Sequence, residues 1–99
     1  MKANVVEIVL FKPKAGVTDE ALVKAAAGID EFTQDQAGFL KRELAQTEDG
    51  QWIDIVHWTD MASAHHAAEA AMSSPICLPF FSLIDESTIN MNHYTVALS

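Results

Sequence analysis

The chain has 99 residues, of which 49% are hydrophobic, and it carries a formal net charge of −8. Its length and apolar content predict one domain, residues 1–99, and its single cysteine, Cys77, excludes an internal disulfide and a Cys/His zinc framework. The acidic charge argues against nucleic acid and anionic membranes as partners. The first apolar run, interrupted by Glu7, is too short for a signal peptide or a membrane span, so we expect a cytoplasmic protein.

The first half of the chain predicts a strand, a helix and two further strands. Residues 5–12 (VVEIVLFK) are rich in β-branched and aromatic side chains and stop at a proline, which indicates a strand. Thr18, followed by two acidic residues, suits the N-cap of a helix, and apolar residues then recur at helical spacing. These residues are Leu22, Ala25, Ala26, Ile29 and Phe32. Residues 39–47 alternate in polarity, and the Glu-Asp-Gly sequence after them predicts a hairpin to a strand over residues 51–58.

The second half predicts a helix, a short helical segment and a closing strand. Asp60, with Ser63 three residues later, marks a helix start, and an apolar stripe follows it. The stripe consists of Met61, Ala64, Ala68, Ala71 and Met72. Pro75 should end this helix, and the apolar residues 76–84 predict a short helical piece packed on the core. Residues 88–98 alternate as the last strand.

The order β-α-β-β-α-β is that of a ferredoxin-like α+β sandwich, in which a four-stranded antiparallel sheet carries both helices on one face. The helices can cover only that face. Alternate residues of the first and last strands would leave the other face apolar and uncovered. Pairing of two sheets across a two-fold axis would bury this surface, so we expect a homodimer.

The stretch from Ile53 to Phe80 resembles the antibiotic biosynthesis monooxygenase family of the dimeric α+β barrel superfamily. The matching features are a strand that ends in Trp58, the acidic helix start at Asp60, an alanine-rich helix and a Ser-Pro step at Pro75. The rest of the chain has the order and lengths of that architecture.

The resemblance implies a cofactor-independent monooxygenase that acts on a small aromatic or quinol-type metabolite. Such enzymes use neither metal nor flavin, because the anion of an electron-rich hydroxy-aromatic substrate itself reduces dioxygen. The protein must then desolvate the ring, accept a proton and stabilise an oxyanion in an apolar pocket between sheet and helices. We therefore expect no cofactor and no metal.

Histidine is the best base for this chemistry, because its pKa lies near neutrality. His65 is the first catalytic candidate, since it borders the apolar stripe of the second helix; the alternative is a half-exposed surface histidine paired with Glu69. His57 shares a strand face with two isoleucines and is either catalytic or a hydrogen-bonded core histidine. His66 should face solvent, and adjacent helical histidines cannot readily share one metal ion.

Five further residues are candidates for substrate binding. Trp52, Asp54 and Trp58 share one face of the third strand, where the indoles could stack on a ligand or simply pack, and where the carboxylate needs a partner. His93 and Tyr94 lie on opposite faces of the last strand, and alternation does not say which of them faces the helices.

Two alternatives remain open. Relatives of the quinol-type branch carry histidines at the positions of Ala71 and Ile76, which favours a non-catalytic or stress-linked protein that holds a small molecule in the same fold. The third possibility is a structural dimer with a filled core. A cavity of ligand size would argue against this last alternative.

Overall fold

The computed structural model describes residues 4–99, and within them the chain forms one four-stranded sheet with helices on one side. The strands are β1 (Val5–Phe11), β2 (Phe39–Gln46), β3 (Trp52–Trp58) and β4 (Asn90–Thr95). The α-helices are α1 (Asp19–Gln34), α2 (Met61–Met72) and α3 (Leu78–Phe81), and a 3₁₀ helix, η1 (Glu86–Thr88), precedes β4.

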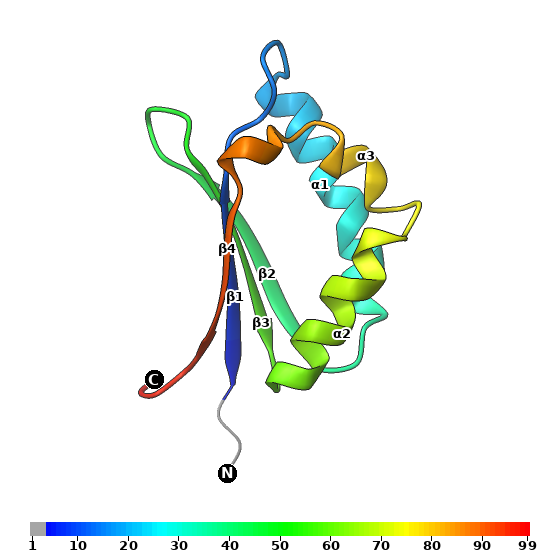
Figure 1. Ribbon diagram of the computed structural model, residues 1–99, viewed down its shortest axis with the longest axis vertical. Helices are drawn as coiled ribbons and strands as arrows, with labels where there is room; N and C mark the ends of the chain where they lie inside the picture. The colour runs from blue at the N-terminus through cyan, green and yellow to red at the C-terminus, as the bar shows by residue number, and fades with distance from the viewer. Residues whose placement is uncertain (1–3) are drawn as a thin grey trace.

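The sheet has the order β2-β3-β1-β4, and each neighbouring pair is antiparallel. Helices α1, α2 and α3 all lie on the same side of the sheet, and nothing in residues 4–99 covers the other side, the bare face (Figure 1). This is the ferredoxin-like α+β sandwich that the element order predicts, and the prediction is confirmed.

The helix starts follow directly from capping residues in the sequence. The Thr18 hydroxyl accepts a hydrogen bond from the backbone N–H of Ala21 at 3.1 Å, and the Asp60 carboxylate accepts one from the backbone N–H of Ser63 at 2.8 Å. Each bond satisfies an N–H that the helix itself leaves without a partner. The two predicted helix starts are therefore correct to the residue.

Gly38 allows β2 to begin close to the start of α2. Its φ is +84°, and a Cβ built there would lie 2.5 Å from the Ser63 side-chain oxygen and 2.7 Å from that of Thr59. The Gly38 carbonyl also accepts a hydrogen bond from the backbone N–H of Thr59 at 2.8 Å. Only glycine combines this backbone conformation with so close an approach.

The core between sheet and helices consists of two separate apolar clusters. The larger one contains Phe11, Leu22, Ala26, Ile29, Trp52, Cys77, Phe80 and Ile84. The smaller one contains Val5, Val56, Trp58, Ala64 and Ala67. Both clusters use the helix-facing residues of β1 and β3, so the space between them lies over the middle of the sheet.

Three details differ from the predicted elements. Met72, expected on the buried stripe of α2, is 73% exposed because it is the last residue of the helix, and Ala67 is buried in that stripe instead. The helical piece predicted over residues 76–84 is only one turn, α3. The last strand begins at Asn90 because Asp85 caps η1 by accepting a hydrogen bond from the backbone N–H of Ser87.

The bare face of the sheet is apolar at its centre. Val6, Ile8 and Leu10 of β1 lie beside Ile53 and Ile55 of β3, because these residues alternate with the helix-facing ones in the pairing register. All five are only partly buried in the single chain. The sheet thus has two apolar faces and only one layer of helices.

Candidate functional site

A cavity of about 860 Å³ lies between the sheet and the helices, between the two core clusters. Its wall is mostly apolar and includes Val9, Phe11, Phe32, Trp58, Phe80 and Met91. The α2 side is lined partly by Ala67, Ala68 and Ala71, whose short side chains occupy little of the space. The volume is within the usual range for small-molecule sites. The alternative of a filled core therefore does not describe this chain.

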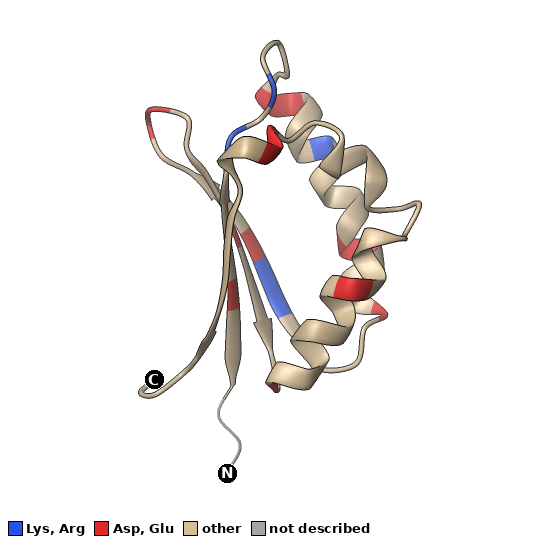
Figure 2. Cartoon of the chain, in the orientation of Figure 1, with Lys and Arg blue, Asp and Glu red and all other residues tan. Residues whose placement is uncertain are grey.

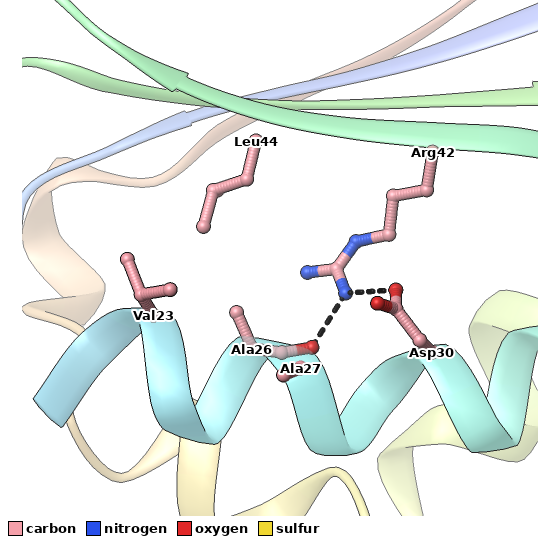
Figure 3. Close-up of a pocket in the computed structure, with 6 residues that line it drawn as sticks. All are labelled: Val23, Ala26, Ala27, Asp30, Arg42 and Leu44. Atoms are coloured by element: carbon pink, nitrogen blue, oxygen red, sulfur yellow. Dashed lines mark hydrogen bonds and ion pairs between the residues drawn. The ribbon is translucent and has the colours of Figure 1, made fainter. Parts of the chain in front are cut away.

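One wall of the cavity contains a buried ion pair. Arg42 of β2 donates two hydrogen bonds to Asp54 of β3, from Nε at 2.8 Å and from Nη2 at 2.7 Å. Its Nη1 donates to the backbone carbonyl of Ala26 at 2.7 Å and to the Asp30 carboxylate at 3.2 Å, both on α1 (Figure 3). The guanidinium also lies 5.8 Å from the centre of the Phe80 ring. These contacts hold Arg42 against both layers of the fold.

The charge of Arg42 is maintained although its side chain is only 5% exposed. Burial opposes the charge, but the hydrogen bonds and negative charges of Asp54 and Asp30 outweigh it and raise the pKa of Arg42. A smaller hollow of about 150 Å³ also borders Arg42, between α1 and β2 (Figure 3). It is below the usual size of a ligand site, so the large cavity is the candidate.

The second polar feature of the cavity wall is Glu7, in the middle of β1. Its carboxylate accepts a hydrogen bond from the indole N–H of Trp58 at 3.2 Å. Burial is the largest influence on its pKa and raises it above the ordinary 4.5; the Trp58 N–H opposes this rise, and the negative charge of Asp54 adds to it. Glu7 therefore holds its proton to a higher pH than an exposed glutamate.

His93 of β4 lies beside Glu7, with its Nε2 3.6 Å from the nearer carboxylate oxygen. This distance is longer than a hydrogen bond, and among the described residues the Nε2 of His93 is the one buried side-chain nitrogen or oxygen that lacks a partner. Burial, helped by the nearby His65, lowers the pKa of His93 below 6.5. Burial thus shifts both pKa values toward the uncharged form, upward for Glu7 and downward for His93.

His65 of α2 connects this pair to solvent. It is exposed, and its ring packs edge-on against that of His93, with the two centroids 4.9 Å apart. Glu7, His93 and His65 thus form a row that runs from the cavity wall to the surface.

The seven residues singled out in the sequence are distributed over both faces of the sheet. Trp58 and Asp54 line the cavity. His93 faces the helices beside Glu7, and His65 packs on it from α2. Trp52 is buried in the larger core cluster, stacked on Phe11 with their ring centroids 6.5 Å apart.

The other two candidates lie on the bare face. His57 alternates with the helix-facing residues of β3, and its Nε2 is 3.6 Å from the carboxylate of Glu43. Tyr94 pairs with Val6 and is 51% exposed. Neither residue lines the cavity, so the two side chains predicted to act in the site lie on the opposite side of the sheet from it.

Two important cavity residues, Glu7 and Arg42, were not among the candidates. A carboxylate inside the apolar run VVEIVLF is a local signal that could have identified Glu7, because a buried charge needs a compensating partner. In the alternating sequence of residues 39–47, Arg42 falls on the same face as Leu40 and Leu44. A charged side chain on an apolar face also needs a partner, so the sequence carried a signal for Arg42 as well.

Within residues 4–99, no group of three or more His, Cys, Asp or Glu side chains is arranged to hold a metal ion. None of the helices in that range has the length and hydropathy that a membrane crossing requires.

No protein-family model and no curated protein matches the chain. Solved structures do match over nearly its whole length. SnoaB, a cofactor-independent oxygenase from Streptomyces nogalater, has a TM-score of 0.76 at 18% identity, covering 98% of this chain and 96% of SnoaB. A proposed antibiotic biosynthesis monooxygenase from Bordetella bronchiseptica has a TM-score of 0.83 at 12% identity, covering 98% of this chain and all of that one (100%).

A proposed monooxygenase from Shewanella loihica PV-4 is 25% identical, with a TM-score of 0.70, and the match covers 100% of this chain and 99% of that one. At these identities the comparisons establish the fold. The chain has the fold of the antibiotic biosynthesis monooxygenases, and the resemblance predicted from residues 53–80 is confirmed at that level.

Proposed function

We propose that the chain, as one domain over residues 1–99, is a cofactor-independent monooxygenase that oxygenates a small hydroxy-aromatic or quinol-type molecule in the cavity. The observation that supports this most directly is the cavity of about 860 Å³, whose wall is mostly apolar and carries a few polar groups. An apolar wall removes water from the ring and strengthens the electrostatic effect of those groups. The neighbours SnoaB and the two proposed monooxygenases have the same fold.

The proposed reaction draws all its electrons from the substrate. A ring hydroxyl or an activated ring C–H gives up a proton, and the resulting anion reduces dioxygen and combines with it at carbon. At a ring CH₂ group, one oxygen atom remains on the carbon as C=O, and the other leaves as water with the two hydrogen atoms of that carbon. No external reductant is consumed.

Glu7 is the proposed proton acceptor, because of the two carboxyl groups that lie deep on the cavity wall, Glu7 and Asp54, it is the one that is not paired with Arg42. Asp54 is bound to Arg42, whereas Glu7 accepts only the neutral N–H of Trp58. Its raised pKa makes it a stronger base than an exposed carboxylate. His93 and His65 lie between Glu7 and solvent and are the proposed exit route for the proton, with a bridging water or a small side-chain movement needed to close the 3.6 Å between Glu7 and His93. His65 then has a role one step removed from the substrate.

Oxygen uptake with a panel of anthrones and hydroquinones tests this assignment. Glu7→Gln keeps the hydrogen bond to Trp58 but cannot accept a proton, so it should lower kcat by about 10²-fold or more. His93→Gln should give a smaller loss that is greatest at low buffer concentration, because small buffer molecules can replace a proton relay. His66→Gln, an exposed neighbour of His65 on α2, is the matched control and should leave uptake unchanged.

Two results would contradict the proposal. One is uptake no faster than the free reaction in solution for every substrate. The other is activity that survives Glu7→Gln but is lost in His57→Gln, since His57 lies on the far side of the sheet.

The second candidate function is ligand binding without catalysis. It is favoured by Ala71, a cavity-lining residue at a position where the quinol-type relatives carry histidine. Tight binding of an aromatic ligand with no accelerated uptake would support it over the oxygenase.

We also propose that the chain is a homodimer through the bare face of the sheet, in a cytoplasmic setting and without nucleic acid or membrane as partner. The partly exposed Val6, Ile8, Leu10, Ile53 and Ile55 form the apolar centre of that face. Light scattering should give twice the mass of the chain at micromolar concentration, and Ile8→Glu should give the monomer. A monomeric wild type would contradict this.

A further inference from the structure

The charges on the cavity wall have one predominant sign. Among residues 4–99, four carboxyl groups line it, those of Glu7, Asp54, Glu69 and Glu86, and the one lysine or arginine side chain on it is that of Arg42. Glu69 and Glu86 are exposed and come from α2 and η1, whereas Glu7 and Asp54 lie deeper, on the sheet. In Figure 2 acidic positions (red) occur on the helices and on several strands, and the basic positions (blue) on the sheet lie on β2.

Arg42 is not free to bind an anionic ligand. Its Nε and Nη2 donate to Asp54, and its Nη1 donates to Asp30 and to the backbone of α1. Two carboxylates therefore surround one guanidinium whose side chain is 5% exposed. A ligand carboxylate or phosphate would have to displace Asp54, which would leave a buried carboxylate without its partner.

Glu7 also disfavours an anionic ligand. When ionised it repels an anion directly. When protonated it offers a neutral site, which a neutral substrate matches. Transfer of a proton from a neutral ligand to Glu7 also leaves the net charge of the cavity unchanged, whereas a ligand that brings its own anionic group adds a negative charge to a weakly screened space.

We propose that the cavity accepts uncharged aromatic molecules, tolerates a basic substituent, and discriminates against analogues that carry a carboxylate or a phosphate. This rests on the proposed function only in taking the cavity as the ligand site. It restricts the substrate class to hydroxy-aromatics without an acidic group, so acidic precursors would have to be decarboxylated, esterified or amidated before they reach this protein.

Three ligands on one ring separate charge from size: 2-naphthol, 6-(aminomethyl)-2-naphthol and 6-hydroxy-2-naphthoate, titrated into the full chain by calorimetry at neutral pH. The neutral compound should bind, and the carboxylate should bind about tenfold or more weakly than the ammonium compound, because like charges oppose association. High salt should narrow this difference but not remove it, because salt screens the exposed rim more than the buried wall.

Two sets of variants assign the effect. The double variant Glu69→Gln and Glu86→Gln should reduce the affinity difference between the ammonium and carboxylate ligands at low salt. Glu7→Gln should reduce that affinity difference at both low and high salt. The matched control replaces Glu20 and Glu31, exposed residues of α1 outside the cavity, by Gln and should leave it unchanged.

The proposal is overturned if the carboxylate binds as tightly as the ammonium compound, or if both charged ligands bind more weakly than 2-naphthol by the same factor. It is also overturned if none of the three ligands binds, or if the affinity difference between the two charged ligands is unchanged in both sets of variants. Oxygen uptake measured in parallel keeps the two proposals apart. Sign-dependent binding without uptake would reject the oxygenase and retain this inference, and uptake without sign dependence would do the reverse.

Discussion

Replacement of Asp54 by Asn should destabilise the fold far more than replacement of Asp30, although both carboxylates bind Arg42. Asp54 takes two hydrogen bonds, at 2.8 and 2.7 Å, and its side chain is 12% exposed, whereas Asp30 takes one at 3.2 Å and is 54% exposed. In Asp54→Asn the amide oxygen can accept a hydrogen bond from one of the two Arg42 donors. The amide NH₂ then faces the other donor and cannot accept its hydrogen bond. The guanidinium then keeps its charge with only the exposed partner.

Removing one partner of a buried pair costs about 3–5 kcal/mol, and the remaining contact with Asp30 places this case at the lower end, about 3 kcal/mol. For a domain of this size that corresponds to a fall in Tm of roughly 12–24 °C. Asp30→Asn, an exposed pair, should cost less than about 1 kcal/mol. Urea and thermal unfolding without ligand, at one fixed protein concentration because an oligomer makes Tm concentration-dependent, measure both values.

A double variant separates the loss of a partner from the loss of packing. Arg42→Met combined with Asp54→Leu removes both charges and should recover most of the stability lost in Asp54→Asn. Equal losses for Asp54→Asn and Asp30→Asn, or a double variant no more stable than Asp54→Asn, would refute the view that an unpaired buried charge is the cause.

Three further outcomes are expected. Glu7 has a pKa raised on folding, so its ionisation costs stability as the pH rises through that pKa; Glu7→Gln should gain stability over wild type above pH 4.5 and not below it, in urea unfolding across a pH series. Gly38→Ala should lose about 2 kcal/mol or more, since its φ is +84° and its Cβ would overlap the start of α2, and Gly50→Ala, at φ +92° in open space, should lose only about 1 kcal/mol. Ala68→Phe should block ligand binding by calorimetry with the fold retained, whereas Ala62→Phe on the exposed side of α2 should bind normally; equal effects of the two would contradict the position of the cavity.

The sequence was sufficient for the elements and their order, because the signals for these are local. Thr18 and Asp60 cap their helices through side-chain bonds that reach only three residues ahead. The alternation placed Trp52, Asp54, Val56 and Trp58 together on one face of β3 before any partner was known, although both faces of that strand carry apolar side chains. Neighbouring residues thus fixed the α+β sandwich, and the segment around Trp58 indicated the family fold.

The site depended on contacts between residues distant in the chain, which only the tertiary structure decided. Alternation divides β4 into two faces but is symmetric between them, and pairing with β1 in a single register placed His93 opposite Glu7 on the helix side. The hairpin register likewise set Arg42 diagonally across from Asp54, twelve residues away, and made an isolated carboxylate into half of an ion pair. Local patterns determine which residues share a face; the packing of helices on one side of the sheet determines which face becomes the site.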